Sequence, residues 1–115
     1  MHPERELRNG MLVIQHPSNW CKRALARNED DEPVDPVDDD ACQWCMQGAL
    51  DYGNSTVADE TFEVLAYVIN PDKPKSEALN VIADFQDDER TTHEMVMAKF
   101  KEAIEYLQTK GHENG

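Results

Sequence analysis

Apolar residues recur three and four positions apart over most of the chain, and this spacing constrains the fold more than any other feature. It places apolar side chains on one side of an α-helix, whereas a strand requires alternation, which no segment shows convincingly. Prolines and polar connections divide the pattern into segments. The spacing predicts a short helix over Trp20–Arg27 and longer helices over residues 4–15, 39–51, 59–70, 75–86 and 91–110.

The expected fold class is therefore all-α, a compact orthogonal bundle of about five helices with no sheet. A chain of 115 residues has room for one hydrophobic core, so residues 1–115 are expected to form a single domain. The last helix has the clearest ends, because Thr91 and Glu94 fit a capping box and Lys110-Gly111 is typical of a C-terminus. Residues 111–115 are expected to fray.

The segment Trp20–Leu50 contains both tryptophans and all three cysteines of the chain. Two Trp-Cys pairs stand in it, each a few residues ahead of an Ala-Leu pair. Cysteines on an apolar helix face usually behave as small buried hydrophobic residues. Gly48 is expected to let another helix approach closely. The predicted structural core of this segment is Trp20, Cys21, Trp44 and Cys45.

Residues 28–40, between the two Trp-Cys pairs, form an acidic run with two prolines and no basic residue. The run has no helix or strand periodicity, so a solvent-exposed loop is expected. At its end, Asp38 is expected to cap the next helix, while Asp39 and Asp40 complement the helix dipole. A calcium-binding loop is disfavoured, because the acids lack the required spacing and the prolines interrupt them.

The chain has 24 acidic and 11 basic residues, which gives a formal charge of −13. Direct binding of nucleic acid is disfavoured, because phosphate recognition needs clustered Lys and Arg. The same charge steers encounters with a basic protein surface, although solubility alone would also explain it. The predicted partner-binding residues are the eight acids of the loop: Glu29, Asp30, Asp31, Glu32, Asp35, Asp38, Asp39 and Asp40.

Three blocks of the chain follow a distinctive order: Trp20-Cys21-x-x-Ala24-Leu25-Ala26-Arg27, Pro33-Val34-Asp35-Pro36 and Trp44-Cys45-x-x-Gly48-Ala49-Leu50. With Asp88-Glu89-Arg90-Thr91 near the end, they resemble an uncharacterised family of small bacterial and phage proteins, the domain of unknown function DUF6197. The resemblance covers roughly residues 11–107, and Cys42, Phe85 and Gln86 depart from it. It implies a phage or mobile-element context and supplies no catalytic residues.

The cysteines leave two alternatives open. Cys21, Cys42 and Cys45 with His16 or His93 have the donor types of a zinc site, but one Cys-x-x-Cys within a predicted helix is a weak signal. A cysteine-dependent enzyme would pair Cys21 or Cys45 with a histidine, and a reactive thiolate needs a cationic, partly exposed surrounding. We therefore predict no catalytic residue, no metal and no cofactor.

The hypothesis that the sequence favours is a non-catalytic acidic interaction protein that binds and modulates a host protein, with mimicry of DNA charge as its most specific form. The chain shows no signal-peptide core and no membrane-spanning run, so the bacterial host cytoplasm is the expected location and a membrane is not an expected partner. Met95 and Met97 add apolar surface to the last helix, which leaves a homodimer open.

Overall fold

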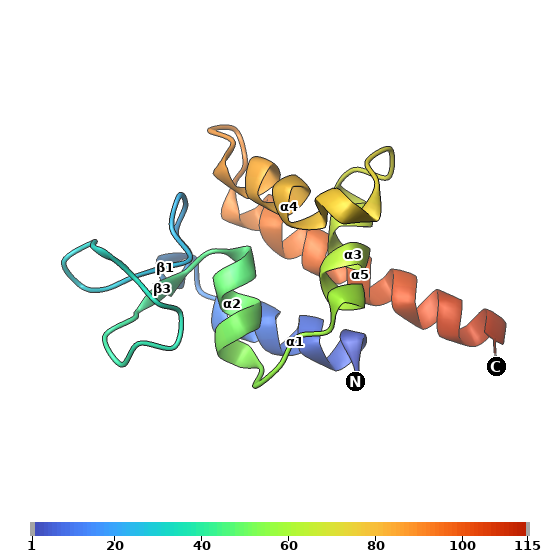
Figure 1. The fold of residues 1–115 in the computed structure, drawn as a ribbon, viewed down its shortest axis with the longest axis horizontal. Coiled ribbons are helices and arrows are strands. Elements are labelled where there is room, and N and C mark those ends of the chain that lie inside the picture. The colour runs from blue at the N-terminus through green and yellow to red at the C-terminus, as the bar shows by residue number, and fades with distance from the viewer. Residues whose placement is uncertain (1, 115) are drawn as a thin grey trace.

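Five α-helices and a small sheet form the described part of the protein (Figure 1). The computed structural model describes the backbone of residues 2–114 and the side chains of residues 2–109. The helices predicted over residues 4–15, 59–70 and 75–86 are confirmed to within a few residues. The helical elements are α1 (Pro3–Val13), α2 (Met46–Gly53), α3 (Asp59–Ile69), α4 (Ala78–Asp87) and α5 (His93–Asn114), with short 3-10 helices η1 (Pro17–Asn19) and η2 (Lys75–Glu77).

A three-stranded antiparallel sheet is also present, so the prediction of an all-α fold without a sheet is wrong. Each strand has two residues, which is too short to give a visible alternation in the sequence. The strand order is β2-β1-β3, and Pro33 lies on the edge strand, where its missing N–H costs least. The strands are β1 (Ala26–Arg27), β2 (Pro33–Val34) and β3 (Gln43–Trp44).

The segment predicted as a helix over Trp20–Arg27 is instead a turn that leads into β1. Its backbone forms hydrogen bonds to β3 and to the residue after β3. The Cys21 N–H donates to the Trp44 carbonyl at 3.1 Å, and the Cys45 N–H donates to the Leu25 carbonyl at 3.1 Å. These bonds to distant residues replace the local bonds of a helix, so the backbone groups are satisfied without one.

Helix α2 begins later than predicted, because the residues before it form a turn and β3. Asp38 therefore does not cap it. Cys45 is the N-cap residue, and its Sγ accepts a hydrogen bond from the Gly48 N–H at 3.3 Å. A Cβ atom at Gly48 would lie 1.9 Å from the Leu25 carbonyl oxygen. Glycine is thus required because the turn before β1, not a helix as expected, crosses the first turn of α2.

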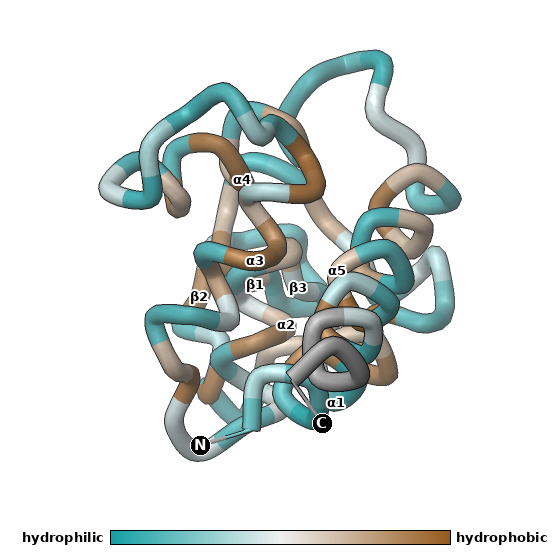
Figure 2. Tube along the Cα trace, turned by 90° about the vertical axis from the view of Figure 1, so that its right-hand side faces the viewer, coloured by the Kyte–Doolittle hydropathy of each residue, from teal (hydrophilic) through white to brown (hydrophobic). Residues whose placement is uncertain are grey.

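The sheet and its loops lie at one end of the helical body, and the C-terminal end of α5 lies at the other (Figure 1). Helix α1 packs against α2 and α5, while α3 packs against α4 and α5. Figure 2 shows hydrophobic stretches within the helices and mostly hydrophilic connections. The largest fully buried hydrophobic side chains are Phe100, Leu7, Ile14, Met46, Leu50, Leu65, Ile82 and Val96.

A buried carboxylate from α1 caps α3. Glu6 accepts hydrogen bonds from the Ala58 N–H at 2.9 Å and from the Thr61 hydroxyl at 2.6 Å. Ala58 occupies the N-cap position of α3 and has no side-chain oxygen of its own. Burial by itself raises the pKa of Glu6, but these hydrogen bonds outweigh it and hold the pKa below its ordinary value. Glu6 is therefore a structural carboxylate.

Helix α5 has Thr92 as its N-cap. The Thr92 hydroxyl oxygen accepts a hydrogen bond from the Met95 N–H at 3.2 Å, whereas Thr91, the predicted N-cap, donates to the Phe85 carbonyl at 2.6 Å. Neither α5 nor any other described helix is long and apolar enough to cross a membrane. Helix α5 extends to Asn114, past its predicted end at Lys110-Gly111, and the fraying expected for residues 111–115 stays a prediction.

One buried amide joins the helical body to the sheet. Gln86, near the end of α4, is 2% exposed. Its Oε1 accepts hydrogen bonds from the Trp20 indole at 2.9 Å and from the Met46 N–H at 3.2 Å. Its Nε2 donates to the Cys21 carbonyl at 3.3 Å and to the Asp87 carboxylate at 2.6 Å. Gln86 thus holds both Trp-Cys segments against α4.

Asp87 and Asp88 complete this junction. The Asp87 carboxylate also accepts the Arg23 N–H at 2.8 Å, where Arg23 has a left-handed φ of 65°. Lys22 donates to the Asp88 carbonyl at 2.6 Å, and its Nζ lies 5.4 Å from the centre of the Trp20 ring. Gln86, Asp87 and Asp88, at the end of α4, therefore all form hydrogen bonds to the turn that follows η1.

We predict that Gln86→Leu lowers the free energy of unfolding by about 2–3 kcal/mol, because each buried group left without a partner costs about 1–3 kcal/mol. Urea unfolding measures the change. Asp84→Ala, at an exposed position of the same helix, is the control and should stay within about 0.5 kcal/mol of the unmodified protein. Equal stability of the two variants would contradict the role assigned to Gln86.

Candidate functional site

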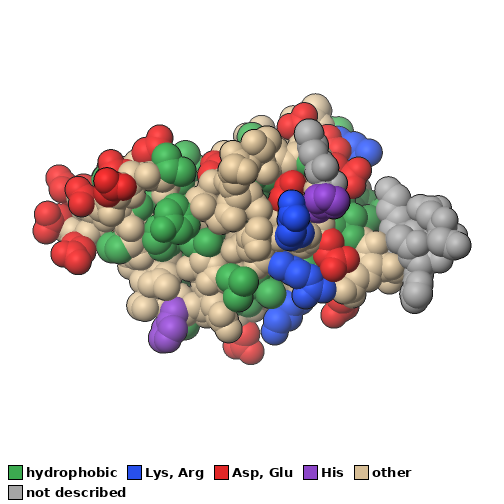
Figure 3. Space-filling view, turned by 90° about the horizontal axis from the view of Figure 1, so that it is seen from below, with side chains coloured by type: hydrophobic (Ala, Val, Ile, Leu, Met, Phe, Trp, Pro, Cys, Tyr) green, Lys and Arg blue, Asp and Glu red, His purple; other side chains and the backbone are tan. Residues whose placement is uncertain are grey.

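The eight acidic residues predicted to contact a partner lie at the sheet end of the molecule. Residues 28–42 are termed the acidic lobe, which consists of two loops on either side of β2. It contains eight acidic residues and no basic one, and all eight acidic side chains are exposed. Figure 3 shows Asp and Glu side chains crowded at this end, while several Lys and Arg side chains gather nearer the middle.

Asn28 and Arg27 shape the first loop of the lobe. The Asn28 side-chain oxygen accepts the N–H groups of Asp30 at 3.0 Å and of Glu32 at 2.9 Å. Arg27 donates to the Asp31 carbonyl at 2.8 Å. Asp31 has a left-handed φ of 64°, which aspartate tolerates better than most residues. The backbone of this loop is therefore fixed by its own hydrogen bonds.

The second loop contains two successive Asx turns and one anchor to the core. The Asp35 carboxylate accepts the Val37 N–H at 3.0 Å, and in the same way the Asp38 carboxylate accepts the Asp40 N–H at 2.8 Å. The predicted helix cap at Asp38 is thus a turn residue of the lobe. The anchor is the Trp44 indole, which donates to the Pro36 carbonyl at 2.9 Å. Trp44 itself is buried in the core.

The charge of the lobe is largely uncompensated. In the described part of the chain, one ion pair involves a lobe carboxylate, that of Asp31 with Arg27 at 3.7 Å. Burial raises the pKa of Asp51 on α2, and the negative charge of Asp35 raises it further. Asp35 and Asp51 therefore repel each other, and a cation placed between them would relieve the repulsion.

The four residues predicted as structural core lie where the sheet meets the helices. Cys21, Trp44 and Cys45 are buried, and Trp20 is half-buried and packs against the core. Burial raises the pKa of Cys21 to about 12 and also raises that of Cys45. Thiols in such surroundings are poor nucleophiles at neutral pH. Cys42 lies apart from them in the lobe and is half-buried.

His16 and His93, the two histidines considered as partners of the cysteines, have different surroundings. The Nε2 atom of His93 lies 2.7 Å from the Ile14 carbonyl, and its ring centre is 6.0 Å from that of Trp20. His16 is exposed. Among the described residues, no three His, Cys, Asp or Glu side chains are grouped so as to hold a metal ion. This geometry favours neither of the two cysteine-based alternatives.

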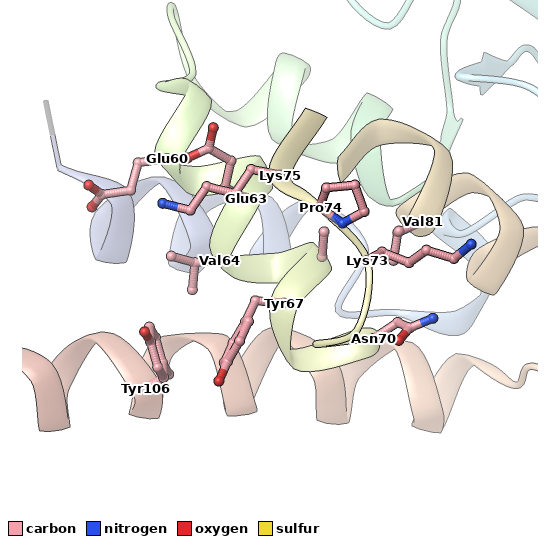
Figure 4. Close-up of a pocket in the computed structure, with 11 residues that line it drawn as sticks. Glu60, Glu63, Val64, Tyr67, Asn70, Lys73, Pro74, Lys75, Val81 and Tyr106 are labelled. Carbon is pink, nitrogen blue, oxygen red and sulfur yellow. The ribbon is translucent and has the colours of Figure 1, made fainter. Parts of the chain in front are cut away.

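A cleft of about 230 Å³ opens beside α3 and α5, away from the sheet (Figure 4). Tyr67 on α3 and Tyr106 on α5 stand in it with ring centres 5.3 Å apart. Two glutamates and two lysines give the cleft balanced charges, in contrast to the acidic lobe. Its lining includes Glu60, Glu63, Val64, Lys73, Lys75 and Val81.

The chain belongs to the family described as "Family of unknown function (DUF6197)", whose match spans residues 2–106. The match confirms the resemblance seen in the two Trp-Cys blocks and extends it through α1. No curated protein and no solved structure matches the chain.

Three residues that shape this end of the molecule have little signal in the sequence: Val37, Tyr52 and Gln86. Tyr52 lies on α2 and Trp44 on β3, so their stacking does not follow from the spacing of residues on one helix. Val37 stands alone between acids, where an apolar residue is easily taken for part of a flexible loop. Gln86 lies near a helix end, where polar residues are usually exposed.

We predict that iodoacetamide at about pH 8, close to the pKa of an ordinary thiol, modifies Cys42 well before Cys21 and Cys45 in the folded protein. The reason is that burial raises the pKa of the latter two thiols. Mass spectrometry of tryptic peptides locates the modification, and Cys42→Ser should remove the fast phase. Rapid modification of Cys21 or Cys45 in the folded protein would revive the cysteine-dependent enzyme as a hypothesis.

Proposed function

We propose that this protein is a non-catalytic acidic interaction protein that binds a basic surface on another protein through the acidic lobe. The observation that carries the proposal is the array of eight exposed carboxylates on two hydrogen-bonded loops, without a basic residue among them. Loops that are already ordered lose less conformational entropy on binding. Their shared charge also speeds encounter with a basic surface.

Mimicry of DNA charge is the specific form of this proposal. Carboxylates on a fixed scaffold fit a basic groove that otherwise receives phosphates. The partner is then a protein rather than a nucleic acid, because phosphate binding needs clustered Lys and Arg, which the lobe lacks. Anionic lipid surfaces would repel the lobe for the same reason.

We further propose a phage or mobile-element origin, with the partner in the cytoplasm of the bacterial host. The family resemblance implies this context, in which a small protein modulates a host protein by binding to it. The raised pKa of the buried Cys21 and Cys45 thiols supports a role without thiol chemistry.

The test is capture of host proteins from a bacterial lysate at about 0.05 M and about 1 M salt, between which the screening length falls from over 10 Å to about 3 Å. We expect a basic partner that is retained at low salt and released at high salt. The lobe variant replaces Asp30, Asp39 and Asp40 by Asn, because these carboxylates accept none of the hydrogen bonds that shape the loops. It should retain much less of the partner.

The matched control removes the same number of charges elsewhere, with Asp84→Asn, Glu89→Gln and Glu105→Gln at exposed positions outside the lobe. We expect this control to retain the partner nearly as well as the unmodified protein. Equal loss in both variants would assign binding to net charge rather than to the lobe. If no basic protein is retained at low salt, the proposed function is wrong.

A further inference from the structure

Val37 is the most exposed large hydrophobic side chain in the described residues, at 65%. It stands in the second loop of the acidic lobe, and its N–H is held by the Asp35 carboxylate at 3.0 Å. A single exposed valine on a protein surface is ordinary. This one matters because it is fixed in position and because a second, aromatic group is linked to the same loop.

The second group is Tyr52 on α2. Its ring stacks on Trp44 with 4.6 Å between ring centres and 28° between planes. Trp44 in turn binds the carbonyl of Pro36, the residue before Val37. Tyr52 is 49% exposed although Trp44 stacks on its ring. Val37 and Tyr52 are together termed the anchor patch.

Two carboxylates are close to the anchor patch in the chain. Asp35 precedes it in the loop, and Asp51 precedes Tyr52 on α2. Burial raises the pKa of Asp51, and the negative charge of Asp35 raises it further, so a cation bound by one of these carboxylates is also attracted by the other. An aromatic ring beside two carboxylates suits a guanidinium group, which stacks on the ring and pairs with both acids. A lysine ammonium lacks the planar surface for stacking.

We propose that the anchor patch receives an arginine side chain of the basic partner protein, with its guanidinium stacked on Tyr52 and paired with Asp35 and Asp51. Val37 packs against the apolar part of the same partner segment. This inference rests on the proposed function, because it names the residue type that the basic partner presents. It gives the lobe a central contact of the kind in which Tyr, Trp and Arg dominate binding energy.

The test uses two defined probes of equal charge, a hexa-arginine peptide and a hexa-lysine peptide, with the full chain at low salt. A uniform field of carboxylates would prefer arginine only slightly, because a guanidinium pairs with a carboxylate through two hydrogen bonds. The anchor patch predicts that the arginine peptide binds about three-fold to ten-fold more tightly, the range expected for one stacked cation. Isothermal titration calorimetry measures both affinities.

The two tryptophan indoles report where the peptide binds. Trp44 lies beneath the anchor patch, while the Trp20 indole donates to Gln86 at the junction with α4. In a ¹⁵N-labelled sample we expect the Trp44 indole resonance to shift as the arginine peptide is added and the Trp20 resonance to stay nearly unchanged. This measurement on the unmodified protein does not depend on the stability of any variant.

Two substitutions of Tyr52 separate the contribution of its aromatic ring from that of its apolar volume. Tyr52→Leu keeps an apolar side chain but removes the aromatic face, so it should lose most of the preference for the arginine peptide and keep only the small part that comes from pairing with carboxylates. Tyr52→Phe keeps the face and should keep the preference for arginine. Thermal unfolding checks that both variants are folded.

The outcomes distinguish this inference from the function on which it rests. If both peptides bind equally and the Trp44 resonance does not move, the anchor patch is refuted while binding by the lobe stands. If the arginine preference is undiminished in Tyr52→Leu, stacking on Tyr52 is refuted. If neither peptide binds at low salt, both the inference and the proposed function are wrong.

Discussion

The side-chain amide of Gln86 forms hydrogen bonds to both segments that carry a Trp-Cys pair, and to Asp87 beside it. A buried backbone N–H or carbonyl without a partner costs about 1–3 kcal/mol, so these segments need both an acceptor and a donor at this point. An amide supplies both from one side chain, whereas a carboxylate supplies acceptors alone and leucine supplies neither. The contact between the helices and the sheet therefore depends on this residue type.

The position of the acidic lobe follows from that contact through Trp44. Its carbonyl accepts the Cys21 N–H, its indole donates to Pro36 in the second loop, and its ring stacks on Tyr52. One buried side chain thus links the core, the lobe and α2. The eight carboxylates are held at one end of the molecule although each prefers to be far from the others. This arrangement is what makes the lobe a candidate surface for a basic partner.

The sequence was sufficient to predict the elements whose pattern is local. Helices α3 and α4 followed from apolar spacing and from the prolines between them, and the exposure of the lobe followed from its prolines and its lack of periodicity. The 3-10 helix η2 before α4 was not predicted as a separate element. The sheet could not be predicted from the sequence, because Ala26 pairs with Val34 and Trp44 through strands of only two residues. Apolar spacing over Trp20–Arg27 imitated a helix, while bonds to distant residues determined its actual backbone.

The candidate site likewise combines features that the sequence predicts with features that only tertiary contacts determine. Its acidic residues could be named from the sequence, but the anchor patch could not, since Val37 and Tyr52 are related through Trp44 rather than through their spacing. The buried surroundings that raise the pKa of Cys21 and Cys45 were likewise set by packing. The residue types of the acidic lobe therefore predicted its charge. Tertiary contacts determined where its carboxylates lie and which side chains surround them.

The core holds the acidic lobe rigidly through Trp44. Hydrogen exchange of the Trp44 indole N–H, followed with increasing urea and compared with the backbone amide of Leu65 in α3, tests this most directly. We expect both groups to exchange only through global unfolding, with the same opening free energy and the same dependence on urea. Exchange of the Trp44 indole through a local opening of much lower free energy would contradict the claim, because the acidic loops would then move independently of the helices.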